Sequence, residues 1–206
     1  RFQMKKLFFI TLLAVFSIFF MYASGDGPGT WTQSLSSAGQ IWGIAVAPSS
    51  PQTIYTARNS TGMWKSTNSG ANWVQINTGL SNLILQCVAV SPTNANVVMC
   101  GSTNTGTNPG VYRSSDGGSN WTRVVTGITE TNINIQALAI DPVNPNTAYC
   151  TLFDGTTNSP NGLYKTTNGG TLWVPITTGI GTIKNFLAIA VNPLNANVVY
   201  AGTSFD

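Results

Sequence analysis

One pattern of apolar and polar positions occurs three times along this chain. Each copy reads Gly, an apolar residue, an aromatic residue, Lys or Arg, two hydroxyl residues, Asn or Asp, any residue, Gly, any two residues and Trp. The copies span residues 62–73, 110–121 and 162–173. Three gapless matches of this length predict a repeat architecture.

A second apolar pattern precedes each copy and occurs once more after the third. Large apolar residues alternate with Ala and then reach a Pro, in residues 44–48, 88–92, 138–142 and 189–193. A polar turn and another apolar run follow each Pro. Each unit therefore predicts four short strands with turn residues between them. A period of roughly 50 residues with four strands per unit is typical of a β-propeller, whose blades are four-stranded antiparallel sheets around an axis.

The predicted repeat is incomplete at both ends of the chain. Three complete blades span 41–77, 84–125 and 135–177, and a fourth begins at Phe186. Residues 30–33 resemble an isolated fourth strand. We therefore expect an all-β, incomplete propeller that forms the N-terminal part of a longer ring, with an exposed sheet face.

The turn between the third and fourth strands has its own chemistry. Its Asn or Asp can accept hydrogen bonds from backbone amides of the turn, its Gly supplies a backbone conformation closed to other residues, and its Trp can wedge between blades. The positions to which we assign these structural roles are Asn68, Gly70, Trp73, Asp116, Gly118, Trp121, Asn168, Gly170 and Trp173.

Residues 114–121, Ser-Ser-Asp-Gly-Gly-Ser-Asn-Trp, resemble the Asp-box or BNR repeat, with the pattern S-x-D-x-G-x-x-W. The outer copies carry Asn, which keeps the acceptor oxygen. The resemblance covers nearly everything after residue 30. It implies that these turns are structural and that ligands meet the opposite end of the blades. That end is formed by the connections from the second to the third strand and from each blade to the next.

The N-terminus has the features of a targeting segment. Lys5 and Lys6 precede an apolar run over residues 7–22, and Ala23-Ser24-Gly25 offers small residues for cleavage. This order predicts a signal peptide over 1–25, with residues 1–3 upstream of the initiator Met4. The alternative is an uncleaved anchor helix, but the run is shorter than the roughly 20 residues that a spanning helix needs. We expect export, with no membrane attachment after cleavage, and a mature propeller over 26–206.

Charged residues make up only 7% of the chain, against roughly 25% in ordinary soluble domains. The excess of basic residues lies in the N-terminal segment, so the body is neutral and gives no electrostatic case for nucleic acid. The absence of His removes Ser-His-Asp and Cys-His catalysis and most zinc sites. We predict no cofactor and no metal.

The three cysteines allow two interpretations. A hairpin that pairs Val90 with Val97 would place Cys87 opposite Cys100, which would permit a disulfide in an exported protein. Alternatively Cys87, Cys100 and Cys150 are free thiols in small buried positions, because the other units carry Gly, Ala or Thr there.

Candidate ligand-binding residues lie in the loops opposite the repeated turns or near the axis. They are Trp42, Arg58, Asn59, Glu130, Asp154 and Lys184. We expect Glu130 and Asp154 to be solvated loop carboxylates. No catalytic set is complete, since a sialidase needs three arginines and Arg58 alone lies near this face.

The first blade also resembles xyloglucanase-type glycoside hydrolases, which typically carry a catalytic Asp just before the third strand, and Asn59 falls near that place. An amide cannot act as a general base, so a two-carboxylate mechanism loses one member. The leading hypothesis is an exported, non-enzymatic module that binds protein or carbohydrate, as in sortilin-type receptors, photosystem II assembly factors and bacterial surface proteins. The alternatives are a secreted glycoside hydrolase of xyloglucanase or sialidase type, with some acids in blades outside this sequence, and a lectin-like propeller.

Overall fold

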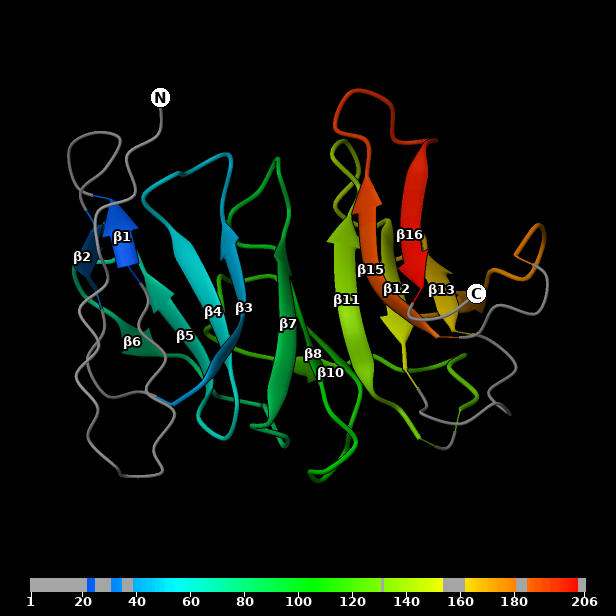
Figure 1. The fold of residues 1–206 in the computed structure, drawn as a ribbon, viewed down its shortest axis with the longest axis horizontal. Coiled ribbons are helices and arrows are strands. Elements are labelled where there is room, and N and C mark those ends of the chain that lie inside the picture. The colour runs from blue at the N-terminus through cyan, green and yellow to red at the C-terminus, as the bar shows by residue number, and fades with distance from the viewer. Residues whose placement is uncertain are drawn as a thin grey trace, which may run out of the picture.

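The computed structural model describes residues 22–24, 31–34, 39–130, 132–153, 162–180 and 185–203. Within these ranges the protein consists of three four-stranded antiparallel sheets and two two-stranded sheets (Figure 1). No described residue belongs to a helix capable of crossing a membrane. The predicted signal segment falls outside the described residues as far as residue 21.

Each four-stranded sheet is a meander of consecutive strands. The first blade contains β3 (Ile41–Val46), β4 (Ile54–Arg58), β5 (Gly62–Ser66) and β6 (Val74–Gln75). The second contains β7 (Leu85–Val90), β8 (Val98–Ser102), β9 (Val111–Ser114) and β10 (Thr122–Arg123). The third contains β11 (Ile135–Ile140), β12 (Ala148–Leu152), β13 (Leu163–Thr166) and β14 (Val174–Pro175). These bounds confirm the three predicted units.

Two pairs of strands flank the complete blades. Strands β15 (Phe186–Val191) and β16 (Val199–Thr203) form a hairpin with the register of the first two strands of a blade. Strand β1 (Tyr22–Ser24) pairs with β2 (Trp31–Gln33). The first strands of the four units, β3, β7, β11 and β15, contact one another in sequence order (Figure 1). The predicted incomplete propeller is therefore confirmed.

The core lies between blades. One cluster joins Tyr55 and Met63 of the first blade to Cys100 and Tyr112 of the second. The other cluster joins the opposite face of the second blade to the third, with Met99 and Val111 against Cys150 and Tyr164, among others. Successive residues of a strand point to opposite faces, so each inner blade buries both faces against its two neighbours.

The repeated turns form the hydrogen bonds expected of them. Asn68 Oδ1 accepts the backbone N–H of Asn72 over 2.8 Å, and Asp116 Oδ1 accepts that of Asn120 over 2.9 Å. Asn168 makes the equivalent bond with Leu172. The hydroxyl two residues before this Asn or Asp also takes part, a role that was not predicted. Gly118 N donates to Ser114 Oγ over 2.8 Å, and the first and third turns repeat this bond with their own Ser or Thr.

The Trp and Gly of each turn contact the fourth strand of the preceding blade. Trp121 Nε1 donates to the Ile76 carbonyl oxygen over 2.8 Å. A Cβ added to Gly118 would lie 2.3 Å from Ile76 Cδ1. Trp73 Nε1 likewise donates to Ser34 Oγ over 3.1 Å, so Ser34, which follows β2, occupies the position of Ile76. The predicted isolated fourth strand therefore lies before the first blade as β6 lies before the second.

The cysteines follow the second interpretation. Ser91 N donates to the Val97 carbonyl oxygen, so Val90 pairs with Val98 and the register differs by one residue from the predicted pairing. Cys87 consequently lies opposite Gly101 and Cys100 opposite Val88. All three thiols, that of Cys150 included, are free and buried, and burial raises the pKa of Cys87 to about 12. The disulfide interpretation is wrong.

Candidate functional site

The first strand of every blade contains the same irregularity near its start. The register shifts by one residue between Ile41 and Gly43, and shifts at the equivalent place in the other three units. Such a bulge places two residues opposite one and redirects a side chain, often next to functional sites. The residues at the four bulges are Trp42, Gln86, Gln136 and Leu187.

Three of these bulged residues converge on one pocket. Trp42, Gln86 and Gln136, which we call the amide–indole site, line a cavity of about 400 Å³ together with Ile41. Each side chain comes from a different blade. The cavity lies where the connections between blades meet the first strands, and we call this the loop end of the blades. The predicted apolar candidate Trp42 therefore lies in a pocket whose other lining residues were not among the predicted candidates.

The amide–indole site offers hydrogen bonds without charge. Gln86 Nε2 donates to Gln136 Oε1 over 2.6 Å, which fixes both side chains. A carboxamide has two N–H donors and a carbonyl oxygen with two lone pairs. The Gln86–Gln136 pair therefore can still donate and accept further hydrogen bonds. The Trp42 side chain is 45% exposed. An exposed indole beside oriented amides suits an uncharged polar ligand with an apolar face.

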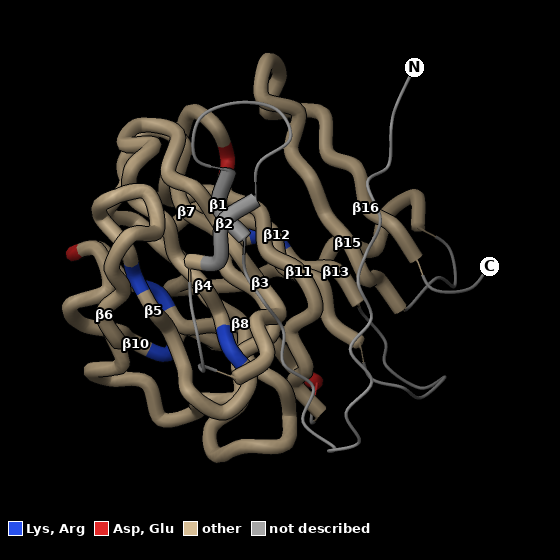
Figure 2. The backbone as a smooth tube through the Cα atoms, turned by 60° about the vertical axis from the view of Figure 1, so that its left-hand side comes forward, with Lys and Arg blue, Asp and Glu red and all other residues tan. Residues whose placement is uncertain are grey.

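Further amides lie along the same end of the blades. Asn59 Nδ2 donates to Gln40 Oε1 over 3.2 Å, and Asn104 donates to Asn132 Oδ1. The candidate Asn59 is therefore engaged with the segment that enters β3. These pairs link loops of neighbouring strands or blades. Charged residues are few and scattered along the described backbone (Figure 2), whereas these hydrogen-bonded pairs consist of uncharged amides.

Arg58 is part of the core rather than of an open face. Its side chain is completely buried, and its guanidinium carbon lies 4.2 Å from the centroid of the Trp64 ring. Its Nε donates to Thr56 Oγ1 over 3.3 Å, and burial lowers its pKa to about 10. A cation held against an aromatic face in this way stabilises the blade. The structure does not bring it into the amide–indole site.

Glu130 is buried as well, which contradicts the expectation of a solvated carboxylate. It is 9% exposed and accepts a hydrogen bond from the Tyr164 hydroxyl. Burial is the larger cause and this hydrogen bond the second, and together they raise the pKa of Tyr164 to about 12. In the second blade the equivalent Tyr112 hydroxyl bonds to Ser81 Oγ over 2.9 Å. Glu130 therefore fixes the connection between blades to the third strand of the next blade.

The remaining predicted candidates, Asp154 and Lys184, lie outside the described residues. Within the described ranges no group of three or more Cys, Asp or Glu side chains could hold a metal ion. The sequence did contain a signal for Gln86 and Gln136, because they share a repeat position with Trp42. The bulge that brings them together has no such signal.

No protein-family model and no curated protein matches the chain at a significant level. Solved structures do match. An ancestral GH74 enzyme has a TM-score of 0.65 and 25% identity, over 80% of this chain and 22% of that chain. The GH74 enzyme of Niastella koreensis has a TM-score of 0.56 and 21% identity, over 73% of this chain and 24% of that chain.

A third structure, YCF48 bound to D1 peptide, has a TM-score of 0.50 and 14% identity. That match covers 72% of this chain and 44% of YCF48. The chain thus spans from about a fifth to less than half of the proteins that it resembles. With the blades described above, these similarities show that the chain has the all-β fold of an incomplete β-propeller.

Proposed function

We propose that this protein is a non-enzymatic binding module whose ligand contacts the amide–indole site. One observation carries the proposal: bulges in three different blades direct Trp42, Gln86 and Gln136 into one cavity. The cavity combines an exposed aromatic ring with amide donors and acceptors, and none of the described residues that line it is charged. A sugar ring has an apolar face and many hydroxyl groups, so the favoured ligand is a neutral oligosaccharide.

A binding experiment tests this proposal. Isothermal titration of the full chain with neutral xyloglucan oligosaccharides is expected to show saturable binding that Trp42→Ala weakens by about tenfold or more, as for a central aromatic contact. Gln86→Ala and Gln136→Ala should each weaken binding as well. Tyr200, 63% exposed on β16, supplies the matched control, since Tyr200→Ala should leave affinity unchanged.

Two outcomes would count against this choice of ligand. Binding that Trp42→Ala and Tyr200→Ala leave equally strong would place the glycan elsewhere. A lack of glycan binding, with capture of a protein partner that Trp42→Ala abolishes, would assign the same site to a protein. The similarity to YCF48, solved with a D1 peptide, makes a protein ligand the second candidate for this module.

The repeated turns are proposed to be Asp-boxes with a structural role. The spacing Ser114, Asp116, Gly118 and Trp121 supports the assignment, together with the hydrogen bonds from Asn120 and Gly118 into the turn. Because these bonds occupy the Asp116 and Ser114 oxygens, the side chains serve the turn itself. Asp116→Ala is therefore expected to impair folding. The fraction of the variant that folds should bind glycan as the unmodified protein does.

Export of the module is also part of the proposal, with residues 1–25 as a cleaved signal peptide and 26–206 as the mature chain. Lys5, Lys6, the apolar run and the small residues at 23–25 support it. Mass spectrometry of protein expressed with its N-terminus intact should find a mature chain that begins close to residue 26. An intact N-terminus in the cytoplasmic fraction would contradict export.

A glycoside hydrolase is the alternative function, and the likeness to GH74 enzymes favours testing it. Hydrolysis by two carboxylates needs a pair flanking the bond. Among the described residues Glu130 is the carboxylate near the loop end, whereas Asp116 and Asp141 lie in turns at the other end. Reducing-sugar release from xyloglucan that Glu130→Gln abolishes, while oligosaccharide binding persists, would establish the hydrolase.

A further inference from the structure

In the first two blades the third strand carries a cation that approaches the turn of the next blade. In the first blade, Lys65 Nζ donates to the Gly117 carbonyl oxygen over 3.0 Å and lies 5.4 Å from the centroid of the Tyr55 ring. The Tyr55 hydroxyl donates to the Ala95 carbonyl oxygen over 2.9 Å. Tyrosine and lysine together occupy the space between the first and second blades at the turn end, opposite the loop end.

The junction between the second and third blades lacks this tyrosine. Met99 pairs with Arg113 as Tyr55 pairs with Lys65, and Met99 has no hydroxyl to reach the next turn. The Arg113 guanidinium makes one long hydrogen bond, from Nη2 to Asn146 Oδ1 over 3.5 Å. Its Nε is buried and has no hydrogen-bond partner among the described residues. A buried donor in this state is costly unless an acceptor forms a hydrogen bond with it.

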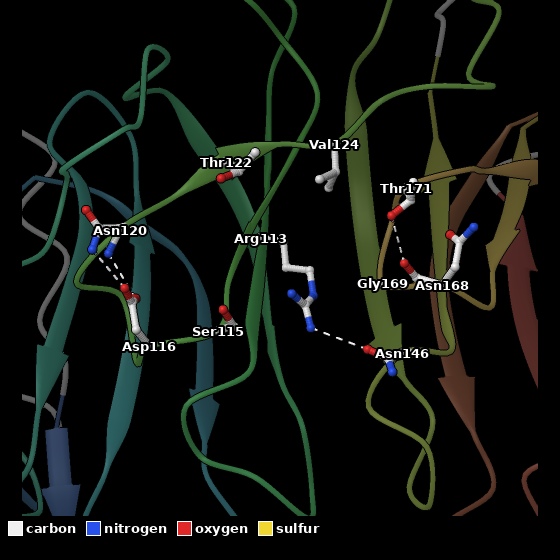
Figure 3. A pocket seen from close by; sticks show the side chains of 10 residues that line it. All are labelled: Arg113, Ser115, Asp116, Asn120, Thr122, Val124, Asn146, Asn168, Gly169 and Thr171. Carbon is white, nitrogen blue, oxygen red and sulfur yellow. Dashed lines mark hydrogen bonds between the residues drawn. The ribbon is translucent and has the colours of Figure 1, made fainter.

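A crevice of about 310 Å³ lies beside this guanidinium (Figure 3). Arg113 points across it toward Asn146 and the turn that holds Asn168, while Asp116 and Asn120 lie at the far side. The other lining groups include the Thr122 and Thr171 side chains. Both Asp116 oxygens already accept hydrogen bonds from Ser114 or Asn120. Arg113 is thus the cationic donor among the described residues that line the crevice.

We propose that this crevice binds a small hydroxylated monocarboxylate, with the ligand carboxylate on the Arg113 guanidinium. A planar guanidinium edge matches a carboxylate and strengthens the hydrogen bonds by charge. A single negative charge is favoured over two because Asp116 also lines the crevice and repels additional negative charge. The surrounding amides and hydroxyls suit ligand hydroxyl groups, and the volume fits a small molecule.

The test uses D-galacturonate as the probe for the full chain, with D-galactose as its uncharged counterpart and inorganic phosphate as a more highly charged anion. Isothermal titration should detect galacturonate binding, with galactose and phosphate weaker by about tenfold or more. The ¹H–¹⁵N resonance of the Arg113 Nε–H group should shift during the galacturonate titration. Equal binding of galactose, or no galacturonate binding, would overturn the proposal.

Variants separate the crevice from the rest of the surface. Arg113→Gln should weaken galacturonate binding roughly tenfold, and Arg113→Lys should also weaken it, because lysine keeps the charge but loses the planar guanidinium with its paired donors. Met99→Tyr should close the crevice by restoring the arrangement of Tyr55 and Lys65. Arg123 is the matched control, since its Nε and Nη2 already donate to the Pro109 carbonyl oxygen.

Arg123→Gln should therefore bind galacturonate as the unmodified protein does. Unchanged binding in a folded Arg113→Lys or Arg113→Gln variant would contradict the assignment, whatever the outcome at the amide–indole site. The two sites lie at opposite ends of the blades, so Trp42→Ala should leave galacturonate binding intact. Galacturonate binding by Trp42→Ala would show that the crevice acts independently of the amide–indole site. Failure of the crevice proposal can thus be distinguished from failure of the proposed function.

Discussion

Trp173 donates its indole N–H to the carbonyl oxygen of Val124 over 2.9 Å, and so connects the third blade to the fourth strand of the second. Trp121 makes the same connection from the second blade to the first. Both side chains are almost completely buried, at 1% and 4% exposure. Each contact thus combines a large buried apolar area with one oriented hydrogen bond.

Removal of the Trp173 side chain should cost far more stability than removal of the equally large Trp42. We expect Trp173→Ala to lower the free energy of unfolding by about 3–5 kcal/mol, as for a buried aromatic residue. Trp173→Phe should cost roughly 1–3 kcal/mol, because the Val124 carbonyl loses its partner. Urea denaturation measures both. A loss for Trp42→Ala as large as that for Trp173→Ala would contradict this view of the core.

Two glycines at the same repeat position separate backbone strain from packing. Gly127 and Gly179 have φ of 90° and 83°. A Cβ on Gly127 would lie 2.1 Å from the Trp173 carbonyl oxygen, whereas one on Gly179 would meet no atom of the described residues within 4 Å. Gly179→Ala should therefore cost about 1 kcal/mol for its left-handed backbone alone.

Gly127→Ala should cost more than Gly179→Ala by about 1–3 kcal/mol, because the added methyl group overpacks the contact between blades. The difference between their free energies of unfolding is the quantity to measure. Equal values would show that the Trp173 backbone moves away without a penalty.

Asp116 should make part of the stability dependent on acid. Hydrogen bonds from the Asn120 side chain and backbone, then from the Ser114 hydroxyl, lower its pKa from 3.8 to about 2. The folded state thus binds this proton less readily than the unfolded state. The stabilisation is complete above the unfolded pKa, near 3.8, and is lost as the pH falls toward 2.

Asp116→Asn removes this titration but keeps the acceptor, as Asn68 and Asn168 do in the other turns. Urea midpoints of the two proteins should therefore be compared from pH 6 to pH 2. The unmodified protein should lose stability relative to the variant between about pH 4 and pH 2. A constant difference over that range would exclude Asp116 as the source.

The thiols should resist alkylation in the folded protein. Cys100 and Cys150 are fully buried, and burial raises the pKa of each well above its usual range. Thiolate is the reactive form, so iodoacetamide at pH 8 should modify the cysteines only after unfolding in urea. Mass spectrometry counts the added groups. Rapid labelling without urea would contradict their burial, and a mass lower by two hydrogens would indicate a disulfide.

The repeats predicted the fold well because the signal was redundant. Three copies of the turn residues and four of the first strand specify the same blade, and the strand bounds follow them closely. The register of β7 and β8 was harder, since a shift by one residue between Val97 and Val98 changes no apolar pattern. That shift turned a possible pair of Cys87 and Cys100 into residues on opposite faces.

The candidate site was predicted less well because it depends on individual side chains. Arg58 and Glu130 lie in loops or at strand ends, where charge usually means exposure, yet Trp64 and Tyr164 cover or bind them in the core. Gln86 and Gln136 share the repeat position of Trp42, but their residue type alone did not mark them as candidates. Their importance comes from the bulges in β7 and β11, which are a property of backbone pairing rather than of residue type.

The contact between one blade's Trp and Gly and the preceding fourth strand has an evolutionary consequence. Because the donor groups and the accepting strand recur in each unit, a duplicated blade arrives with both halves of a compatible interface. Val124 and Ile76 are interchangeable as acceptors, since each offers only its backbone carbonyl. Whole blades can therefore be gained by gene duplication with this interface intact. Bulged positions such as Trp42 and Gln86 lie outside the interface, so substitutions there leave it unchanged.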